Sequence, residues 1–427
     1  MPLDYPIHER TLANGLRVVV SPDHTVPTAT VNIWVNVGSR HEVDGRTGFA
    51  HLFEHLMFQG SENVASGEHF SLLMSAGGRL NATTWFDRTN YFETVPVGAL
   101  DLALWLEADR HARLLSAVTQ ENLDNQRDVV KEEKRQRYDN VPYGNAMTDI
   151  YATVFPDGHP YHHPTIGSMA DLDAASVADV HTFFQAHYRP DNTLVTIVGD
   201  VEPDDAFARV ERYLGAIPAR TGATRPNLDQ LAPLTEPSRL EVLGDVPSDR
   251  LYVAFRLPAD TDPDFLAAGL ALEAIGGLTM SRLVRRLVRA DQLALSVQAH
   301  AMGFVDGVSL GMFSIDVAEG VEPAVVEAAF VEELATFAQE GPTEAELEAA
   351  LAQSERSWLQ ALASQEDRAD MISHYALLHR DAGRINTLLD SLSAISAHRV
   401  REVAATWLAP SARAVVAYLR APEAEAA

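Results

Sequence analysis

Residues 45–60 read GRTGFAHLFEHLMFQG, and the spacing of the apolar residues predicts a helix. Inside it lies His-Leu-Phe-Glu-His at 51–55. On a helix, residues three and four apart share a face, so His51, Glu54 and His55 project together. Two imidazoles at this spacing can bind one zinc ion, and Glu54 can take a proton from a water activated there. The alternative interpretation of these five residues is a solvent-exposed helix face that carries two histidines by chance.

Length and charge limit what the protein is and what it binds. The chain has 427 residues, which is too long for one typical core and predicts two domains of about 200 residues each. Acidic residues outnumber basic ones by 60 to 33, so the formal net charge is -27. Such a surface repels nucleic acid and anionic membranes, and we exclude both as partners. There is no cysteine, so any metal must be held by His, Asp or Glu.

The sequence predicts a protein outside the membrane. Its first residues, MPLDYPIHERTLANG, contain neither the basic nor the apolar region of a secretory signal. No apolar stretch reaches the roughly 18 residues that span a bilayer. We therefore expect a soluble, cytoplasmic protein. Its acidic surface would attract basic peptides, although acidity also serves solubility.

Strand and helix signals follow one plan in the two halves of the chain. In the first half, TATVNIWVNVGSR (28–40) alternates as a buried strand does, RLNATTWFDRTNYFETVP (79–96) contains two strands, and DNTLVTIVGD (191–200) is an apolar strand. Amphipathic helices stand between the last two. After residue 237 a similar series of strands and helices returns, and the chain ends on another apolar strand, ARAVVAYLRAP.

A segment rich in Pro, Thr and Gly, at 219–236, is typical of an interdomain linker. The similarity of the halves indicates a repeat of pattern rather than of identity. We therefore predict an α+β fold with two homologous domains, at 1–218 and 237–427. Each domain should contain a mixed, mostly antiparallel sheet of about six strands, packed with helices.

Several longer stretches carry a family resemblance in their order along the chain. H-x-x-E-H is the reverse of H-E-x-x-H and is the inverzincin signature. The quoted regions resemble the pitrilysin, insulysin and mitochondrial processing-peptidase family: GSRHEVDGRTGFAHLFEHLMFQG, GGRLNATTWFDRTNYFETVP, RDVVKEEKRQ, HPYHHPTIGSMADL and YRPDNTLVTIVGDV. The resemblance implies a zinc endopeptidase that hydrolyses peptides or unfolded segments inside a chamber. It also implies one Zn²⁺ per chain, with His51 and His55 as ligands, Glu54 as the general base, and a C-terminal domain without metal.

The family supplies its third zinc ligand as a glutamate on a later helix, where this chain has Glu132 and Glu133 side by side. With Leu123, Val129 and Val130 marking the buried face, Glu133 falls within about 30° of its centre and Glu132 about 130° away. The family's arginine-based pattern also places the ligand at Glu133. We therefore expect Glu133 to bind the metal and Glu132 to be solvated.

Four other positions match the family: Gln126, Asn81, Ala82 and Phe86. Many relatives have a second glutamate where this chain has Gln126, which we expect to hydrogen-bond near the metal ligands. Asn81 and Ala82 match a strand that pairs with the substrate backbone in this family, the β-augmentation mode, and Phe86 is expected to line the same cleft. An ordinary hairpin asparagine fits Asn81 equally. The histidines of HPYHHP (159–164) are expected in a structural loop.

The C-terminal half departs from the family at two positions that matter for partners. Single-chain relatives carry an arginine and a tyrosine there that bind substrate, but this chain has Val288 and Leu295, which donate no side-chain hydrogen bond. We therefore expect a heterodimer with a homologous, metal-free subunit that bears this Arg/Tyr pair; a homodimer is the alternative. A non-catalytic scaffolding subunit is the rival function. General peptide turnover and leader-peptide maturation remain equally open.

Overall fold

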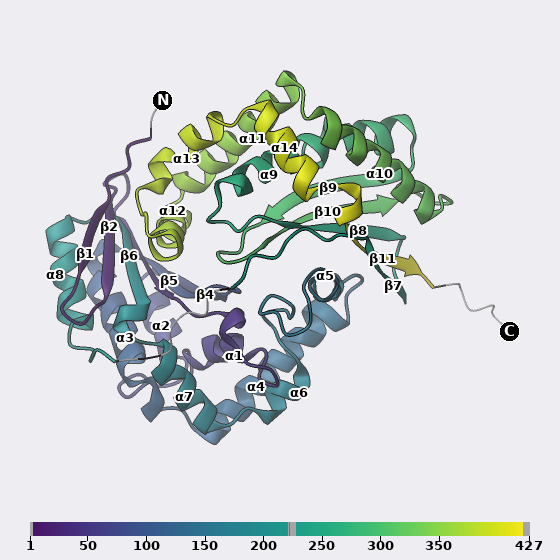
Figure 1. The fold of residues 1–427 in the computed structure, drawn as a ribbon. Coiled ribbons are helices and arrows are strands. Elements are labelled where there is room, and N and C mark those ends of the chain that lie inside the picture. Colours follow the sequence, from purple (N-terminus) through teal and green to yellow (C-terminus); the bar gives the residue numbers. More distant parts are fainter. Residues whose placement is uncertain (1–2, 221, 223–227, 422–427) are drawn as a thin grey trace. The chain divides into compact units, whose positions relative to one another are not determined.

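A computed structural model of the protein describes residues 3–220, 222 and 228–421. The chain forms two compact units, each built on one sheet (Figure 1). Unit 1 consists of residues 1–133, 164–226 and 358–388, and unit 2 consists of residues 134–163, 227–357 and 389–427. Each unit therefore takes one segment from the opposite half of the sequence.

Unit 1 contains a six-stranded sheet in the order β1-β2-β6-β3-β5-β4. Only β2 and β6 pair in parallel; every other neighbouring pair is antiparallel. The strands are β1 (His8–Thr11), β2 (Arg17–Pro22), β3 (Thr28–Val35), β4 (Arg79–Thr84), β5 (Thr89–Pro96) and β6 (Thr193–Gly199). The mixed, mostly antiparallel sheet predicted for the N-terminal half is confirmed.

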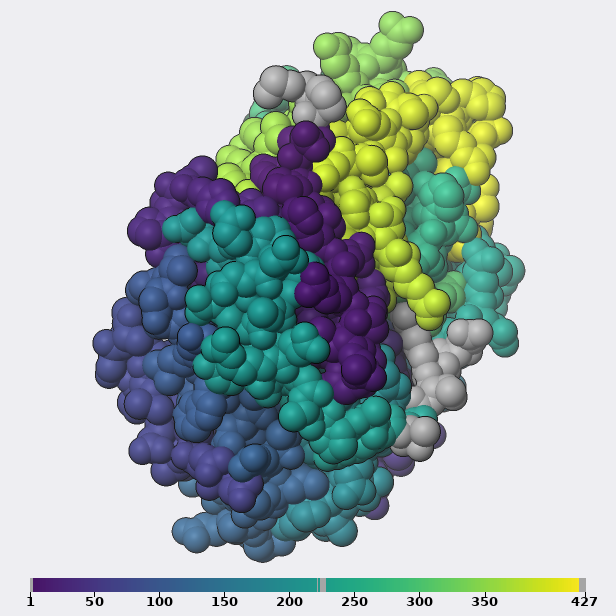
Figure 2. Space-filling model, turned by 90° about the vertical axis from the view of Figure 1, so that its left-hand side faces the viewer, coloured from purple at the N-terminus to yellow at the C-terminus, as the bar shows by residue number. Residues whose placement is uncertain are grey.

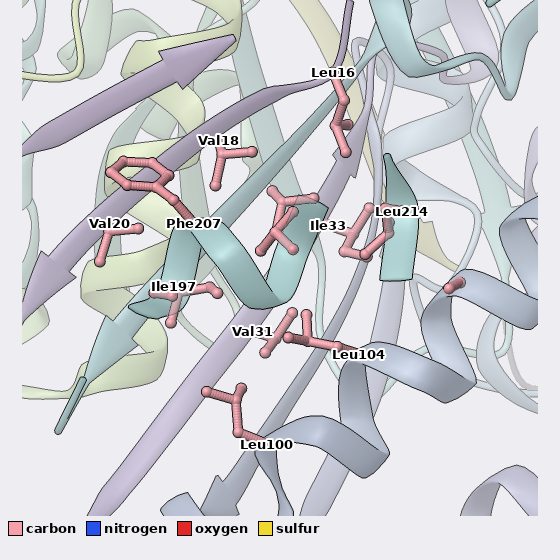
Figure 3. Packing of buried hydrophobic residues seen from close by; sticks show 14 of the residues in the cluster. Leu16, Val18, Val20, Val31, Ile33, Leu100, Leu104, Ile197, Phe207 and Leu214 are labelled. Carbon is pink, nitrogen blue, oxygen red and sulfur yellow. The ribbon is translucent and has the colours of Figure 1, made fainter. Parts of the chain in front are cut away.

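One face of this sheet forms the core of unit 1 with two helices, α3 (Leu100–Arg113) and α8 (Pro203–Leu214). Strand side chains two apart point to the same face, so Val18, Val31 and Ile197 meet the helices together. Figure 3 shows these side chains gathered with Leu104 and Phe207. All are buried, which accounts for the apolar residues that recur at alternate positions along β3 and β6.

The opposite face of the same sheet is covered by α12 (Gln365–His374), which comes from the C-terminal half of the sequence. Its Asp370 accepts hydrogen bonds from Asn32 at 3.2 Å and from Trp34 at 3.0 Å, and Ser373 donates to Thr196 at 2.8 Å. The polar residues that alternate with the apolar ones on β3 and β6 are thus buried against a polar helix face.

The remaining helices of unit 1 position the candidate site or flank the sheet. They are α1 (Phe49–Leu56), α2 (Glu68–Ser75), α4 (Gln120–Lys134), α6 (Met169–Ala174) and α7 (Val177–His187), with the start of α13 (Arg384–Ser393). Figure 2 shows one face of the molecule, on which the N-terminal residues (purple) lie beside α8 (teal). There Arg10 stacks over Phe207 at 4.2 Å and contacts Asp204 at 3.2 Å.

Unit 2 repeats the plan with five strands in the order β7-β11-β8-β10-β9, of which only β7 and β11 pair in parallel. These are β7 (Ser238–Gly244), β8 (Arg250–Leu257), β9 (Ala294–Met302), β10 (Ser309–Val317) and β11 (Ala414–Arg420). Its helices are α5 (Ala146–Val154), α9 (Pro263–Leu272), α10 (Pro323–Glu340), most of α11 (Glu344–Ala363) and α14 (Ala397–Trp407), with π-helical turns at Arg135–Asp139, Glu273–Gly277 and Val284–Ala290. The predicted two-domain α+β fold is confirmed.

Two further expectations concern the segment between the halves and the membrane. The linker at 219–236 and the domain limits beside it stay predictions, because residues 221 and 223–227 lie outside the described residues; those described from 228 to 237 form neither helix nor strand. Among the described residues, no helix is both long enough and apolar enough to cross a membrane.

Candidate metal centre

The helix predicted from residues 45–60 is α1, which begins after Gly48. Gly48 has a φ of +84°, a left-handed conformation that favours glycine, and a Cβ there would lie 2.6 Å from the carbonyl oxygen of Ile166. Leu52, Phe53 and Leu56 are fully buried. Their burial fixes the rotation of α1 about its axis, so the opposite side of the helix, which carries His51, Glu54 and His55, faces the site.

The N-terminus of α1 is held by a carboxylate from outside the helix. Glu42 accepts hydrogen bonds from the backbone N–H groups of Gly48 at 2.9 Å and Ala50 at 2.7 Å. The first N–H groups of a helix have no partner within it, so Glu42 satisfies two of them. Burial raises the pKa of Glu42 to about 8, and its hydrogen bonds from the backbone oppose that rise. Glu42 thereby fixes the first turn, which ends at His51.

The predicted third ligand lies at the end of α4, where Leu123, Gln126 and Val130 are the buried residues. Val129 is 43% exposed, so its use as a marker of the buried face was wrong. The face follows the spacing 123, 126, 130, and the next residue along it is Glu133. Glu133 is directed into the site despite the wrong marker, because Leu123 and Val130 alone define nearly the same direction.

The structure brings His51, His55 and Glu133 together. Their ligand atoms lie within 4.8 Å of one another. The distances from the Glu133 Oε2 atom are 3.8 Å to His51 Nε2 and 3.4 Å to His55 Nε2. Two imidazole nitrogens and one carboxylate oxygen are a donor set that suits zinc with a position left for water, and all three side chains retain some exposure. The residues therefore fit the metal that the sequence pattern predicts.

Glu54 stands on the same helix and contacts the edge strand of the sheet. Its carboxylate accepts a hydrogen bond from the hydroxyl of Thr84, on β4, at 2.5 Å. Burial raises the pKa of Glu54, and the hydrogen bond from Thr84 opposes that rise. A carboxylate held in one orientation, with a pKa moved toward neutrality, suits a general base.

One short helix, α6, connects the helix that carries the histidines to the helix that carries Glu133. Asp171 accepts hydrogen bonds from the backbone N–H of Thr47 at 2.8 Å and from its hydroxyl at 2.6 Å, just before α1. From α4, Arg127 donates to the carbonyl oxygens of Leu172 at 2.8 Å and Ala175 at 2.7 Å. The distance between the two ligand-bearing helices is thus set by contacts with the same element.

The predicted substrate-binding residues lie on and after β4, which is an edge strand of unit 1. Asn81 is exposed and its side-chain oxygen accepts a hydrogen bond from the N–H of Ala82 at 2.9 Å. Ala82 is buried at 7% exposure, and Phe86 at 1%. The expected contact of Phe86 with a substrate needs an accessible ring, so in this structure the residue contributes to packing instead. The neighbouring Asp87 forms a buried ion pair with Arg40 at 3.0 Å.

One of the remaining sequence-predicted positions lies on α4, as Glu133 does, and the others lie in unit 2. Gln126 is buried at 7% exposure on the same face of α4 as Glu133. In the HPYHHP loop of unit 2, a ring nitrogen of His162 lies 2.8 Å from the carbonyl oxygen of Phe155, and His159 stacks on the Phe155 ring. Also in unit 2, Val288 is half-buried and Leu295 is 63% exposed on the edge strand β9.

Three residues that shape the site were not identified from the sequence: Glu42, Thr84 and Asp171. The last lies in the stretch HPTIGSMADL, and Glu42 lies in GSRHEVDG, both of which carry the family resemblance. A signal existed for Asp171, since Ser168 and Asp171 have the spacing of a helix N-cap. Nothing in the sequence pairs Thr84 with Glu54, thirty positions away.

Comparison with known proteins finds relatives that cover most of the chain. Residues 17–160 match the family described as "Insulinase (Peptidase family M16)", and residues 174–354 match "Peptidase M16 inactive domain". The zinc protease PqqE of Helicobacter pylori is 29% identical over 374 residues, covering 87% of this chain and 83% of that protein. An uncharacterised zinc protease of Mycobacterium leprae is 30% identical over 338 residues, covering 79% of this chain and 74% of that protein.

Solved structures and subunit relatives extend the likeness. The crystal structure of a protease from Helicobacter pylori has a TM-score of 0.89 and 26% identity, covering 97% of this chain and 99% of that one. A probable mitochondrial-processing peptidase subunit beta of Arabidopsis thaliana is 25% identical over 319 residues, covering 71% of this chain and 58% of that protein. That relative is, by its name, one subunit of an assembly.

Proposed function

Because this chain belongs to peptidase family M16, the insulinase family, we propose that it is a zinc metalloendopeptidase acting on peptides or unfolded segments. The observation that supports this most is the cluster of His51, His55 and Glu133 beside a partly buried Glu54. A bound zinc ion would supply Lewis acidity, which lowers the pKa of water and polarises a carbonyl group. One such ion per chain is proposed.

The chain's own residues supply the rest of the reaction. Glu54 takes the proton of the attacking water and later delivers it to the leaving amine. Thr84 holds the carboxylate of Glu54 in place during both transfers. We propose that the substrate backbone pairs with the outer edge of β4 near Asn81, as an added strand would. A peptide on this edge would lie next to Glu54, because Thr84 belongs to the same strand.

The chain is proposed to act with a second, homologous subunit. Val288 and Leu295 stand where single-chain relatives carry an arginine and a tyrosine, so the oxyanion would lack donors that typically contribute about 10²–10³ in rate. A metal-free partner with the missing arginine and tyrosine would complete an enclosed site that admits only extended chains.

The test compares Glu54→Gln, Glu133→Gln and the neighbouring Glu132→Gln in the full chain. Each is assayed for zinc content and for cleavage of an unfolded peptide, alone and with a homologous, metal-free subunit that bears the Arg/Tyr pair. We expect Glu54→Gln to keep zinc and lose hydrolysis, Glu133→Gln to lose zinc, and Glu132→Gln to behave as the wild type. Hydrolysis by Glu54→Gln would contradict the proposal, and full activity of the isolated chain would contradict the heterodimer.

The scaffolding function is the second candidate, since one of the matched families is described as inactive. That match covers residues 174–354, which include none of the four site residues. In the described part of unit 1, His51, Glu54, His55 and Glu133 are all in place. A scaffold does not need these four side chains together, so the catalytic function has the stronger support.

A further inference from the structure

The two sheets have the same pairing pattern except at one edge. In unit 1, β2 pairs in parallel with β6 on one side and antiparallel with β1 on the other. In unit 2, β7 pairs in parallel with β11 in the same way, but it is the edge strand of that sheet among the described residues. The position that β1 occupies in the first sheet therefore has no counterpart strand in the described part of the second.

Burial follows this difference. The central residues of β2, at 18–21, are buried, whereas most residues of β7 are exposed or half-buried. Leu240 is 37% exposed and Leu243 is 68% exposed. An edge strand with exposed apolar side chains and outward-facing N–H and C=O groups is a template for pairing with another chain, unless it is covered.

A cleft of about 760 Å³ opens along one face of this edge strand. Leu240, Val242 and Gly244 alternate along β7 and line it together, with Tyr418 of β11 beside them. The opposite wall is the turn at 138–145 that leads into α5. Arg239, on the other face of β7, instead contacts Glu327 of α10.

The opposite wall of the cleft is fixed by its own contacts. The hydroxyl of Tyr143 donates a hydrogen bond to the carbonyl oxygen of Ser248 at 2.6 Å, and the Arg250 guanidinium lies 3.8 Å from the Tyr143 ring. Tyr418 packs edge-on against Tyr143, with ring centroids 5.7 Å apart, and its hydroxyl donates to Asp149 at 2.6 Å. The cleft is therefore bounded by packed aromatic groups on one side and by one face of β7 on the other.

The charge of the cleft favours a cation. Among the residues that the structure describes, its lining includes three aspartates, Asp139, Asp149 and Asp245, and neither lysine nor arginine. Asp139 lies 3.7 Å from Lys134, whereas Asp245 is exposed at the end of β7. The whole chain carries a net charge of -27, so a second copy would bring further negative charge to the same place.

We propose that β7 and this cleft form a docking site for an extended, basic peptide segment of about five to seven residues. The length follows from the seven residues of β7, since a paired strand rises about 3.4 Å per residue. The peptide lies antiparallel to β7, as β1 lies on β2, and directs lysine or arginine side chains toward Asp245 and apolar side chains toward Leu240. The inference does not rest on the proposed peptidase activity, because the site is built from unit 2 alone.

The experiment measures binding to the full chain carrying Glu54→Gln, so that hydrolysis cannot interfere. The probe is a heptapeptide, Lys-Thr-Lys-Thr-Val-Thr-Val, with fluorescein at its C-terminus, followed by fluorescence anisotropy. Its lysines and valines occupy alternate positions and so share one face, which in an antiparallel pairing places the lysines beside Asp245 and the valines beside Leu240. Control peptides replace lysine by glutamate, or carry N-methyl groups on alternate amides to block strand pairing. Asp245→Lys tests the charge, Asp245→Asn gives a milder change, and Glu348→Lys is the matched control on an exposed position of α11.

We expect Asp245→Lys to weaken binding of the basic probe about three- to tenfold, Asp245→Asn by less, and Glu348→Lys hardly at all. The glutamate peptide and the N-methylated peptide should bind at least tenfold more weakly than the probe. Equal affinity of the Asp245→Lys and Glu348→Lys proteins would overturn the proposal and place the peptide elsewhere, for example on β4. Dimerisation that Asp245→Lys abolishes, seen by sedimentation without peptide, would overturn it in favour of a second copy.

Discussion

The carboxylate of Glu42 accepts a hydrogen bond from the backbone N–H of Ala50 at 2.7 Å, immediately before the first metal-ligand candidate, His51. The same carboxylate binds the N–H of Gly48. A side chain nine residues upstream of His51 therefore sets where α1 begins. Because His55 lies one turn further along the same helix, the position of both imidazoles depends on this contact.

Replacing Glu42 by alanine should lower both stability and metal affinity. The loss of a helix-capping acceptor costs about 1 kcal/mol in free energy of unfolding, within a range of roughly 0.5–2. Loosening of the first turn should also weaken zinc binding several-fold, which a competition titration with a chelator measures. The matched control is Glu68→Ala, because Glu68 accepts from the N–H of Ala65 at the start of α2, away from the ligands. Equal zinc affinities of the two variants would contradict a positioning role for Glu42.

Replacing Thr84 by valine should reduce turnover without removing the metal. The hydroxyl donates to Glu54 at 2.5 Å, and a hydrogen bond to a charged group is worth about 1.5–3 kcal/mol. We therefore expect kcat to fall at least tenfold while zinc content stays the same and KM changes little. Thr84→Ser, which restores the hydroxyl, should recover most of the activity. A valine variant as active as the wild type would show that Glu54 does not need this partner.

The sequence predicts the parts of the fold that depend on local pattern. Strand alternation identifies β3, β4, β5 and β6, and the 3.6-residue period identifies α1 and α4. The same local reasoning fails at Val129, which lies next to the buried Val130 but faces solvent. Apolar character alone does not show which of two adjacent residues on a helix is buried. In α4 the buried face includes a polar residue, Gln126, which a search for apolar residues does not find.

Contacts between residues far apart in the sequence cannot be predicted from such local patterns. The helix α12 packs on β3 and β6 across more than 160 positions, and its contacts include polar ones such as those of Asp370 with Asn32 and Trp34. The contact of Thr84 with Glu54 depends on the place of α1 against the edge strand, which no periodicity encodes. Residues of the site that lie on one helix were therefore predictable, whereas those that orient them from other elements were not.

The ion pair of Arg40 and Asp87 should be the costliest single interaction to break near the site. The two side chains lie 3.0 Å apart and are 0% and 3% exposed. Removing one partner leaves a buried charge, so Asp87→Ala should lower the free energy of unfolding by about 3–5 kcal/mol. Urea denaturation of the full chain measures this.

The control for that prediction is the exposed pair of Arg10 and Asp204, which are 45% and 96% exposed at 3.2 Å. Asp204→Ala should leave the free energy of unfolding nearly unchanged. The double variant Arg40→Met, Asp87→Leu should lose less than the sum of its single variants, because it leaves no unpaired charge. Additive losses would mean that Arg40 and Asp87 contribute to the free energy of unfolding independently of each other.

Acid should destabilise the protein through buried histidines in unit 1, of which His69 is the clearest. Burial lowers the pKa of His69 to about 3, with the Arg110 guanidinium acting in the same direction, whereas an unfolded chain has the ordinary value of 6.5. Between these two values the unfolded state binds a proton that the folded state does not, so stability falls as the pH falls below about 6.5. The slope from one such group is about 1.4 kcal/mol per pH unit.

The variant His69→Leu removes this contribution to the pH dependence of stability. Between pH 6 and 5 the wild type should therefore lose about 1 kcal/mol more than the variant in free energy of unfolding, as urea denaturation at the two pH values measures. His398→Gln, at an exposed position of α14, should follow the wild type. Parallel pH profiles for the wild type and His69→Leu would show that His69 is protonated in the folded protein.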